Sequence, residues 1–125
     1  MKDDMPKKIQ CNESGIVNLE NSDSNGSHWV AYFNDPNCRI VEYFDSYGIV
    51  PPPLIQSYLK TSKKSLVHNK VQYQHMTSIL CGWYCLLFIN ERFHGTRPYD
   101  IFYKILSLDP KSNEQILKKY FLQKL

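Results

Sequence analysis

Four kinds of residue in this sequence could together form a thiol-based hydrolytic centre: a cysteine, a histidine, an acid and a glutamine. Cys81 stands directly before Gly82 at the start of an apolar run, and His28 begins a segment rich in aromatic residues. A histidine can take the proton of a thiol, and a carboxylate such as Asp45 can fix the tautomer of the imidazole and stabilise its cation. These residue types predict nucleophilic attack on a carbonyl group, provided that the fold brings them together.

Cys81 is the candidate nucleophile because of its place in a helix predicted over residues 80–93. With Ser78 as the expected N-cap, Cys81 lies in the first turn, where the positive end of the helix dipole lowers the pKa of a thiol. Gly82 would let a substrate backbone approach closely. Cys85 lies one turn further along, within an apolar run, and we interpret it as a buried structural cysteine.

Gln74 is the candidate for a group that stabilises an oxyanion. It lies seven residues before Cys81, at the end of a predicted strand, and its side chain can donate an N–H beside the backbone N–H of the nucleophile. Gln72 is the competing residue, but it would point to the other face if the strand continues that far. Trp29 either lines the cleft beside His28 or lies in the core, and the sequence alone favours the core.

A predicted β-hairpin would bring His28 and Asp45 together. Its two strands flank a strong turn sequence and cover residues 28–33 and 39–44. A register that pairs Phe33 with Ile40 would put His28 opposite Asp45, with their Cβ atoms about 4.5–5.5 Å apart. A slip of one residue would place the two side chains on opposite faces. Taken singly, the histidine could be an ordinary strand-end residue and the aspartate an ordinary turn residue.

The other elements predict an α+β domain in which a mostly antiparallel sheet packs on a buried central helix that carries Cys81. Further strands are predicted over residues 15–19 and 67–73, and further helices over residues 54–60, 98–106 and about 113–123. Ser112 or Asn113 is the expected cap of the last helix. Residues 1–14 are polar and expected to be irregular.

Composition predicts one folded domain over residues 1–125. The chain is 42% hydrophobic and 14% aromatic, which is enough for a core, and its net charge of +3 is too small to indicate a dedicated nucleic-acid binder. The first residues show no apolar signal region, and the longest apolar stretch, residues 79–89, is shorter than the roughly 20 residues that cross a bilayer. We therefore expect a protein made in the cytosol, not secreted and without membrane contact.

The four cysteines are predicted to be free thiols, because no secretory signal accompanies them. A zinc site starting from Cys81 and Cys85 would lack a second ligand pair at suitable spacing, since Cys11 and Cys38 stand alone. No metal site is therefore predicted.

The segments GSHWVAYF, EYFDSYG and QHMTSILCGWYCLLF occur in the order histidine, acid, glutamine, cysteine. This order resembles the adenovirus protease (adenain) family and, more distantly, the ubiquitin-like-protein proteases that share its fold. That family pairs a His-Trp strand start with an acid before an aromatic-Gly turn, and places a glutamine seven residues before a Cys-Gly helix start. The short length and the run up to PPP look closer still to proteases of Polinton/Maverick-type mobile elements and related viruses. The resemblance covers roughly residues 5–90.

The resemblance implies a cysteine endopeptidase in which Cys81, His28 and Asp45 form a triad and Gln74 completes the oxyanion hole. It implies polypeptide substrates such as capsid or core precursors, cleaved at glycine-containing sites, and a location in the cytoplasm or nucleus of a host cell or in a virion. The sequence requires no cofactor, while the resemblance makes a peptide or DNA activator and weak DNA contact conceivable.

The chain also departs from the adenovirus enzymes. It is much shorter, has Asp in place of Glu, and lacks most of the N-terminal region and the long C-terminal extension that contact substrate and cofactor there. Cofactor dependence is therefore in doubt.

Alternatives from other classes stay open. A catalytically inactive relative of the same fold would act as a protein- or DNA-binding module, and a folded protein that a thiol-reactive peptide does not label would favour it. A small nucleic-acid-binding domain would use exposed tyrosines and five lysines: Lys7, Lys8, Lys60, Lys63 and Lys64. Salt-dependent binding without proteolysis would favour that function. Within the protease class, a ubiquitin-like-protein deconjugase is a further alternative.

Overall fold

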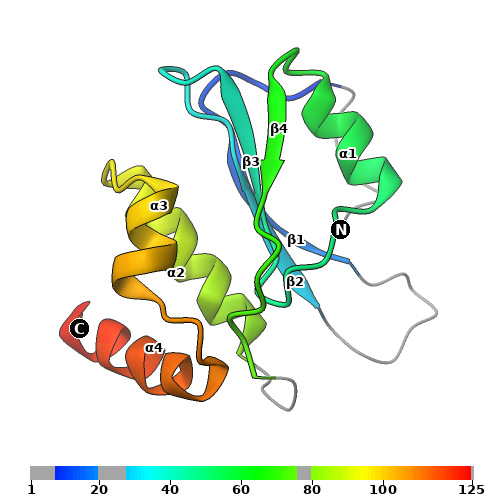
Figure 1. The fold of residues 1–125 in the computed structure, drawn as a ribbon. Helices are drawn as coiled ribbons and strands as arrows, with labels where there is room; N and C mark the ends of the chain where they lie inside the picture. The colour runs from blue at the N-terminus through cyan, green and yellow to red at the C-terminus, as the bar shows by residue number, and fades with distance from the viewer. Residues whose placement is uncertain (1–7, 20–27, 76–79, 125) are drawn as a thin grey trace.

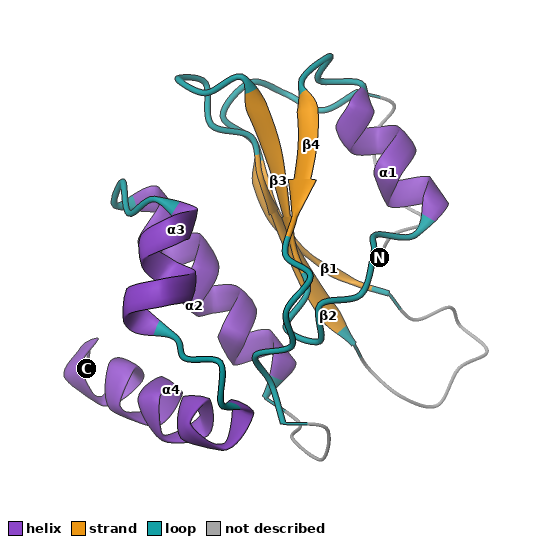
Figure 2. Cartoon of the chain, viewed as in Figure 1, coloured by secondary structure: helices purple, strands orange, loops and turns teal. Residues whose placement is uncertain are grey.

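A four-stranded sheet separates two helical layers in the computed structural model of the chain (Figure 1, Figure 2). The structure describes residues 8–19, 28–75 and 80–124. Helix α1 (Pro53–Lys60) covers one face of the sheet, and helix α2 (Cys81–Phe93) covers the other. The remaining helical segments lie on the α2 side of the sheet, so the predicted α+β class is confirmed.

The sheet is mixed, with two antiparallel pairs and one parallel pair. Its strands, in spatial order, are β1 (Ser14–Asn18), β2 (Trp29–Phe33), β3 (Ile40–Phe44) and β4 (Ser65–His68). The first three follow the predicted positions to within one residue. The connection from β3 to β4 runs through α1, which allows β4 to lie parallel to β3 at the edge of the sheet.

The predicted hairpin register is wrong by two residues. Phe33 pairs with Glu42, not with Ile40. The loop is longer than expected because Asp35 closes a local turn, in which its carboxylate accepts the backbone N–H of Asn37 at 2.9 Å. A shift of two residues preserves the alternation of side chains between the faces, so it does not move the strand's core residues to the opposite face.

The predicted strand over residues 67–73 is also wrong, because β4 ends at His68. Residues 69–74, which we call the strap, run along the turn that follows β3 without forming a ladder. The strap bonds to that turn in another way: the backbone N–H groups of Tyr73 and Gln74 both donate to the carbonyl of Ser46, at 2.8 and 3.0 Å. These bonds to a single carbonyl take the place of the alternating ladder that a strand would need.

Helices α1 and α2 lie where the sequence predicts them. Helix α1 has proline at its first position, as expected from the proline run before it. Helix α2 has Leu80 as its N-cap residue and no side-chain capping bond, while the predicted cap Ser78 lies outside the described residues. The segment predicted as one helix over residues 98–106 is a short α-helical turn, α3 (Pro98–Asp100), continued by a π-helical segment, η2 (Ile101–Ile105).

The last helix, α4 (Pro110–Lys124), begins earlier than predicted. Asp109 precedes it, and its carboxylate accepts the backbone N–H of Lys111 at 3.2 Å, so neither Ser112 nor Asn113 is the cap. Asn113 is fully buried inside the fold, and its amide donates to the carbonyl of Tyr73 at 3.0 Å. This bond ties α4 to the strap.

An apolar cluster on each face of the sheet holds the layers together. On the α2 side, Phe44 stacks on Phe88 with ring centroids 5.0 Å apart. The fully buried residues on the α1 side include Val41, Ile55 and Leu59. Each such side chain stabilises the fold by about 1.5–3 kcal/mol. Among the helices that the structure describes, none is long and apolar enough to cross a bilayer.

Candidate active site

Three chain segments meet where the sequence places its candidate nucleophile, base and acid. His28 lies at the start of β2, Asp45 directly follows β3, and Cys81 is the first residue of α2. The antiparallel β2–β3 pair brings the start of one strand beside the end of the other, and α2 packs across β2 on one face of the sheet. The fold thus gathers groups that are far apart in the sequence.

His28 and Asp45 are in direct contact, as predicted, although the register that was expected to join them is wrong. The distance from His28 Nε2 to Asp45 Oδ1 is 2.9 Å, and the carboxyl side chain is almost completely buried. Continued past β2, the observed ladder would set His28 opposite Tyr47, and their rings indeed lie 5.1 Å apart between centroids. The acid therefore meets the imidazole diagonally rather than directly across the hairpin.

The Cys81 thiol completes a hydrogen-bonded chain that runs from Asp45 through His28. It shares hydrogen bonds with the His28 side chain and with the backbone of Trp29 and Gly82. Burial raises the pKa of the Cys81 thiol, but these hydrogen bonds and the nearby imidazole outweigh it and leave the pKa below its ordinary value. The lowered pKa distinguishes this thiol from an inert core cysteine.

The imidazole has the complementary shift. Burial alone would lower the pKa of His28, but the hydrogen bonds to Asp45 and Cys81 outweigh it and raise the pKa from 6.5 to about 9. The opposite shifts of the two groups favour a pair of thiolate and imidazolium. This charge state is the one that attacks a carbonyl and then protonates a leaving amine.

Gln74 lies beside the acid's turn and is fully buried. The Ser46 hydroxyl donates to Gln74 Oε1 at 2.5 Å, which fixes the orientation of the side-chain amide. The competing Gln72 is exposed, and its Nε2 donates to the carbonyl of Gln74 at 2.8 Å. The alternating faces of a strand do not distinguish Gln74 from Gln72 as the candidate, because the strap is not a strand. Burial separates them instead, and the oxyanion role of Gln74 stays a prediction.

An apolar groove of about 370 Å³ adjoins the nucleophile, and its lining residues are Ile16, Trp29, Gly82, Trp83 and Leu86. The interpretation of Trp29 as a core residue is wrong, since 37% of it is exposed and its ring forms part of this groove. Among the described residues beyond its own helix backbone, an added Cβ at Gly82 would meet just the Trp29 ring, at 3.9 Å. The groove could therefore receive a chain that approaches Cys81.

Cys85 has the structural character predicted for it. It is fully buried, and burial raises the pKa of its thiol well above the ordinary value. All four cysteines are free, so the prediction of free thiols is confirmed. Two thiols one helical turn apart thus differ sharply, because only Cys81 contacts the imidazole.

The chain matches no protein-family model. In sequence it is 34% identical over 97 residues to proteins of African swine fever virus described, in different isolates, as a SUMO-1 cysteine protease or a cysteine protease. The match covers 68% of this chain but only 36% of the viral protein. A crystal structure of the African swine fever virus protease superposes with a TM-score of 0.65 at 22% identity, covering 84% of this chain and 41% of that one. This chain has the fold of a viral cysteine protease.

A second crystal structure of the same viral protease gives a TM-score of 0.58 and covers 88% of this chain. Sequence and structure thus agree on relationship to a viral cysteine protease, and this chain spans about a third of the length of the curated relatives. The similarity to the viral protease establishes the fold of this chain. The roles of individual residues are inferred from the geometry of the site.

Sequence reasoning missed three residues at the site: Ser46, Asn69 and Trp83. Ser46 and Asn69 hold the turn and the strap, and their contacts join positions more than twenty residues apart. No local pattern marks such residues. Trp83 could have been found from the sequence. Residues two positions apart in a helix lie on different faces, so Trp83 is expected on a different face from Cys81, away from the core. It is in fact half exposed.

Proposed function

We propose that the chain is a cysteine endopeptidase that hydrolyses peptide bonds through Cys81, His28 and Asp45. The observation that carries this proposal is the hydrogen-bonded chain from Asp45 through His28 to the thiol, at the first turn of a buried helix. A structural cysteine needs neither an imidazole partner nor a lowered pKa. The relationship to a viral cysteine protease supports the same conclusion.

The mechanism follows from which ring nitrogen faces which partner. Because Nε2 of His28 is bonded to Asp45, Nδ1 is the nitrogen left to hold the proton taken from Cys81. The thiolate attacks the peptide carbonyl carbon, and the oxyanion accepts hydrogen bonds from the Gln74 amide and the Cys81 backbone N–H. The proton on Nδ1 passes to the leaving amine as the C–N bond breaks, which leaves a thioester. Water, deprotonated by Nδ1, then hydrolyses the thioester and restores the thiolate–imidazolium pair.

The proposed substrates are structural precursor proteins of a virus or mobile element, cleaved at glycine-containing sites. The relationship to a viral protease supports this substrate class, and so does the resemblance to adenain and to mobile-element proteases. The groove at Gly82 suits an extended chain that carries small residues next to the scissile bond. Capsid or core precursors are the expected partners, and the enzyme would act in host cytoplasm, nucleus or virion.

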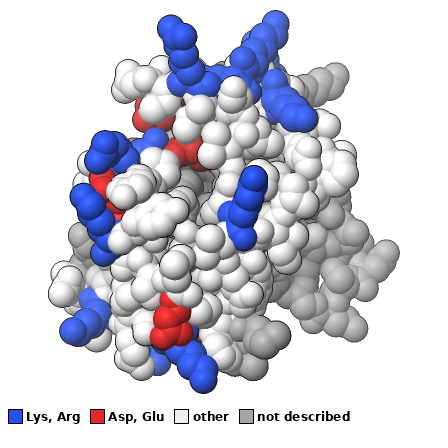
Figure 3. All heavy atoms as spheres, viewed as in Figure 1, with Lys and Arg blue, Asp and Glu red and all other residues white. Residues whose placement is uncertain are grey.

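A second candidate function, nucleic-acid binding, is favoured by one pocket. It has a volume of about 560 Å³, and three of the five candidate lysines, Lys8, Lys63 and Lys64, line it. Figure 3 shows basic side chains gathered at the end of the molecule where α1 and β4 meet. Lys64 is already engaged, donating to the carbonyl of Asp35 at 2.8 Å, and Lys7 lies outside the described residues. Binding that weakens steeply with salt would support this function.

The deciding experiment is reaction of the purified protein with a peptide vinyl sulfone ending in Gly-Gly, read by intact mass and peptide mapping. We expect a single adduct on Cys81 that disappears in Cys81→Ser and His28→Ala and persists in the matched control Cys85→Ser. Equal labelling of all four cysteines in a folded protein, or none, would overturn the proposal and favour a non-catalytic relative.

A panel of substrates then separates the two kinds of protease. Peptides that span glycine-containing precursor sites report endopeptidase activity, whereas carboxyl-terminal fusions of ubiquitin-like proteins report deconjugation. Cleavage of the fusions alone would replace the endopeptidase proposal with the deconjugase alternative, which the name of the viral relative brings into consideration.

A further inference from the structure

The candidate acid is held in place by a side chain from another part of the fold. Asn69, at the start of the strap, accepts the backbone N–H of Asp45 through Oδ1 at 3.0 Å and donates to the backbone carbonyl of Asp45 through Nδ2 at 2.6 Å. One amide thus satisfies both backbone groups of the acid, as a neighbouring strand would have done. It does so where the β3–β4 ladder has ended, because the last pair in that ladder is Tyr43 with His68.

The strap fits the acid's turn closely along its length. Gly48 has a positive φ of 75°, and an added Cβ there would lie 2.8 Å from the backbone carbonyl carbon of Val71. Within the turn, the backbone N–H of Tyr47 donates to Asp45 Oδ1 at 2.8 Å, and this oxygen also contacts His28. The carboxylate's direction therefore depends on the position of its own backbone, which Asn69 fixes.

We propose that Asn69 is a positioning residue of the catalytic centre, which holds the Asp45 backbone so that its carboxylate reaches His28. This inference rests on the proposed function of the site. Misplacement of a catalytic group by about 1 Å can cost on the order of 10²-fold in rate, so two bonds to the backbone of the acid are enough to matter.

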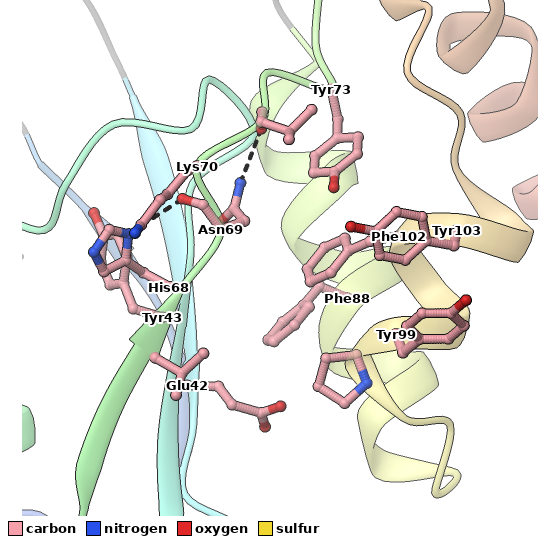
Figure 4. A pocket seen from close by; sticks show the side chains of 13 residues that line it. Glu42, Tyr43, His68, Asn69, Lys70, Tyr73, Phe88, Tyr99, Phe102 and Tyr103 are labelled. Carbon is pink, nitrogen blue, oxygen red and sulfur yellow. Dashed lines mark hydrogen bonds between the residues drawn. The ribbon is translucent and has the colours of Figure 1, made fainter.

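The side chain of Asn69 serves the turn rather than the nearby pocket. Figure 4 shows it at the edge of a pocket of about 360 Å³, with its amide nitrogen directed at the backbone of Val71. The wall of that pocket opposite Asn69 is formed by aromatic side chains of the helices, among them Phe88 and Tyr99, whereas Tyr43 comes from β3 and Tyr73 from the strap. Loss of the Asn69 side chain would thus release the acid's turn and leave the aromatic wall in place.

Several titratable groups face Asp45, and each bears on any pH readout. They come from the strands, the turn and α2: His28, Tyr43, Tyr47 and Cys85. The pKa values of the two tyrosines and of Cys85 are all raised, so these three groups stay neutral through the range in which His28 titrates. A change in the midpoint of His28 therefore reports on its two partners.

The test compares Asn69→Ala with Lys70→Ala, an exposed neighbour on the same strap. We expect the His28 titration midpoint, followed by NMR, to fall by about one pH unit in Asn69→Ala as the acid moves away, and to stay in place in Lys70→Ala. The rate of Cys81 alkylation by iodoacetamide at pH 6 should fall by up to about tenfold in Asn69→Ala, because a less stabilised imidazolium raises the pKa of the thiol, and each unit of that rise lowers the thiolate fraction by at most tenfold.

A double-mutant cycle separates positioning from general stability. If Asn69 acts through Asp45, adding Asn69→Ala to Asp45→Ala should change the alkylation rate by less than about twofold. A further tenfold loss in the double variant would overturn the inference. If Asn69→Ala does not fold, Asn69→Ser provides the comparison, because its short hydroxyl cannot bond both backbone groups of Asp45.

The outcomes distinguish the two proposals. Cys81 that reacts no faster than the exposed Cys11 in the unaltered protein would overturn the proposed protease function itself. Fast alkylation of Cys81 that depends on His28, with an unchanged His28 midpoint in Asn69→Ala, would overturn only the role of Asn69.

Discussion

Replacing Asp45 with asparagine should lower the pKa of His28 by a measurable amount. The rise from 6.5 to about 9 corresponds to about 3 kcal/mol in favour of the imidazolium, at about 1.4 kcal/mol per pH unit. Burial opposes this rise, and Asp45 and Cys81 supply it between them. Asp45→Asn keeps the shape of the side chain and removes its charge. An opposite charge in contact is worth roughly 1–3 pH units, so we expect the midpoint to fall by about 1–2 units.

The assay is an NMR titration of the imidazole protons, with His28 assigned by its absence in His28→Gln. The other three histidines, His68, His75 and His94, provide internal controls in the same spectra. A wild-type midpoint near 6.5 would refute the reasoning, because it would mean that the thiol and carboxylate do not stabilise the cation. A midpoint near 9 that is unchanged in Asp45→Asn would assign the whole effect to Cys81 and remove the acid from the proposed triad.

Three further predictions concern stability, the oxyanion and the groove. In Cys81→Ser, the contact with Asp45 should keep the pKa of His28 raised, and the stability that this adds should be fully present below pH 6.5 and lost as pH rises through the folded-state midpoint. Urea unfolding across that range should show the decline, and a pH-independent free energy would contradict it. Gln74→Ala should lower turnover of a cleavable peptide by about 10²–10³ with little change in KM, and a loss confined to KM would exclude an oxyanion role. Trp83→Ala should raise KM by about tenfold with kcat nearly unchanged, because it removes apolar surface from the groove, and an unchanged KM would show that substrate does not bind there.

Elements with strong local signals were predictable from the sequence. The β2–β3 hairpin, helix α1 behind its prolines and helix α2, which packs one face on the sheet, each have composition and periodicity that are visible within a few residues. The contact of His28 with Asp45 was predicted from an incorrect register, and it survived because the error was an even number of residues. An odd error would have placed the two side chains on opposite faces of the sheet.

The strap was not predictable, because its structure depends on partners distant in the sequence. Residues 69–74 read as a strand continuation, yet β4 ends where the Asn69 side chain replaces the ladder. Asn113 likewise resembles a helix cap, but it is buried against the carbonyl of Tyr73. In both cases an amide side chain satisfies backbone groups that local patterns would assign to secondary structure.

The strap fixes the position of the acid relative to that of the proposed oxyanion group. Asn69 fixes the backbone of Asp45 at one end of the strap, and Gln74 at the other end bonds to Ser46, the next residue of the same turn. Two groups with different proposed tasks are thus bonded to one turn, residues 45–48, and Asn113 of α4 bonds to the strap as well. Breaking the bonds that the strap makes to this turn should therefore alter the acid and oxyanion contacts together, whereas replacing an exposed strap side chain such as Lys70 should alter neither.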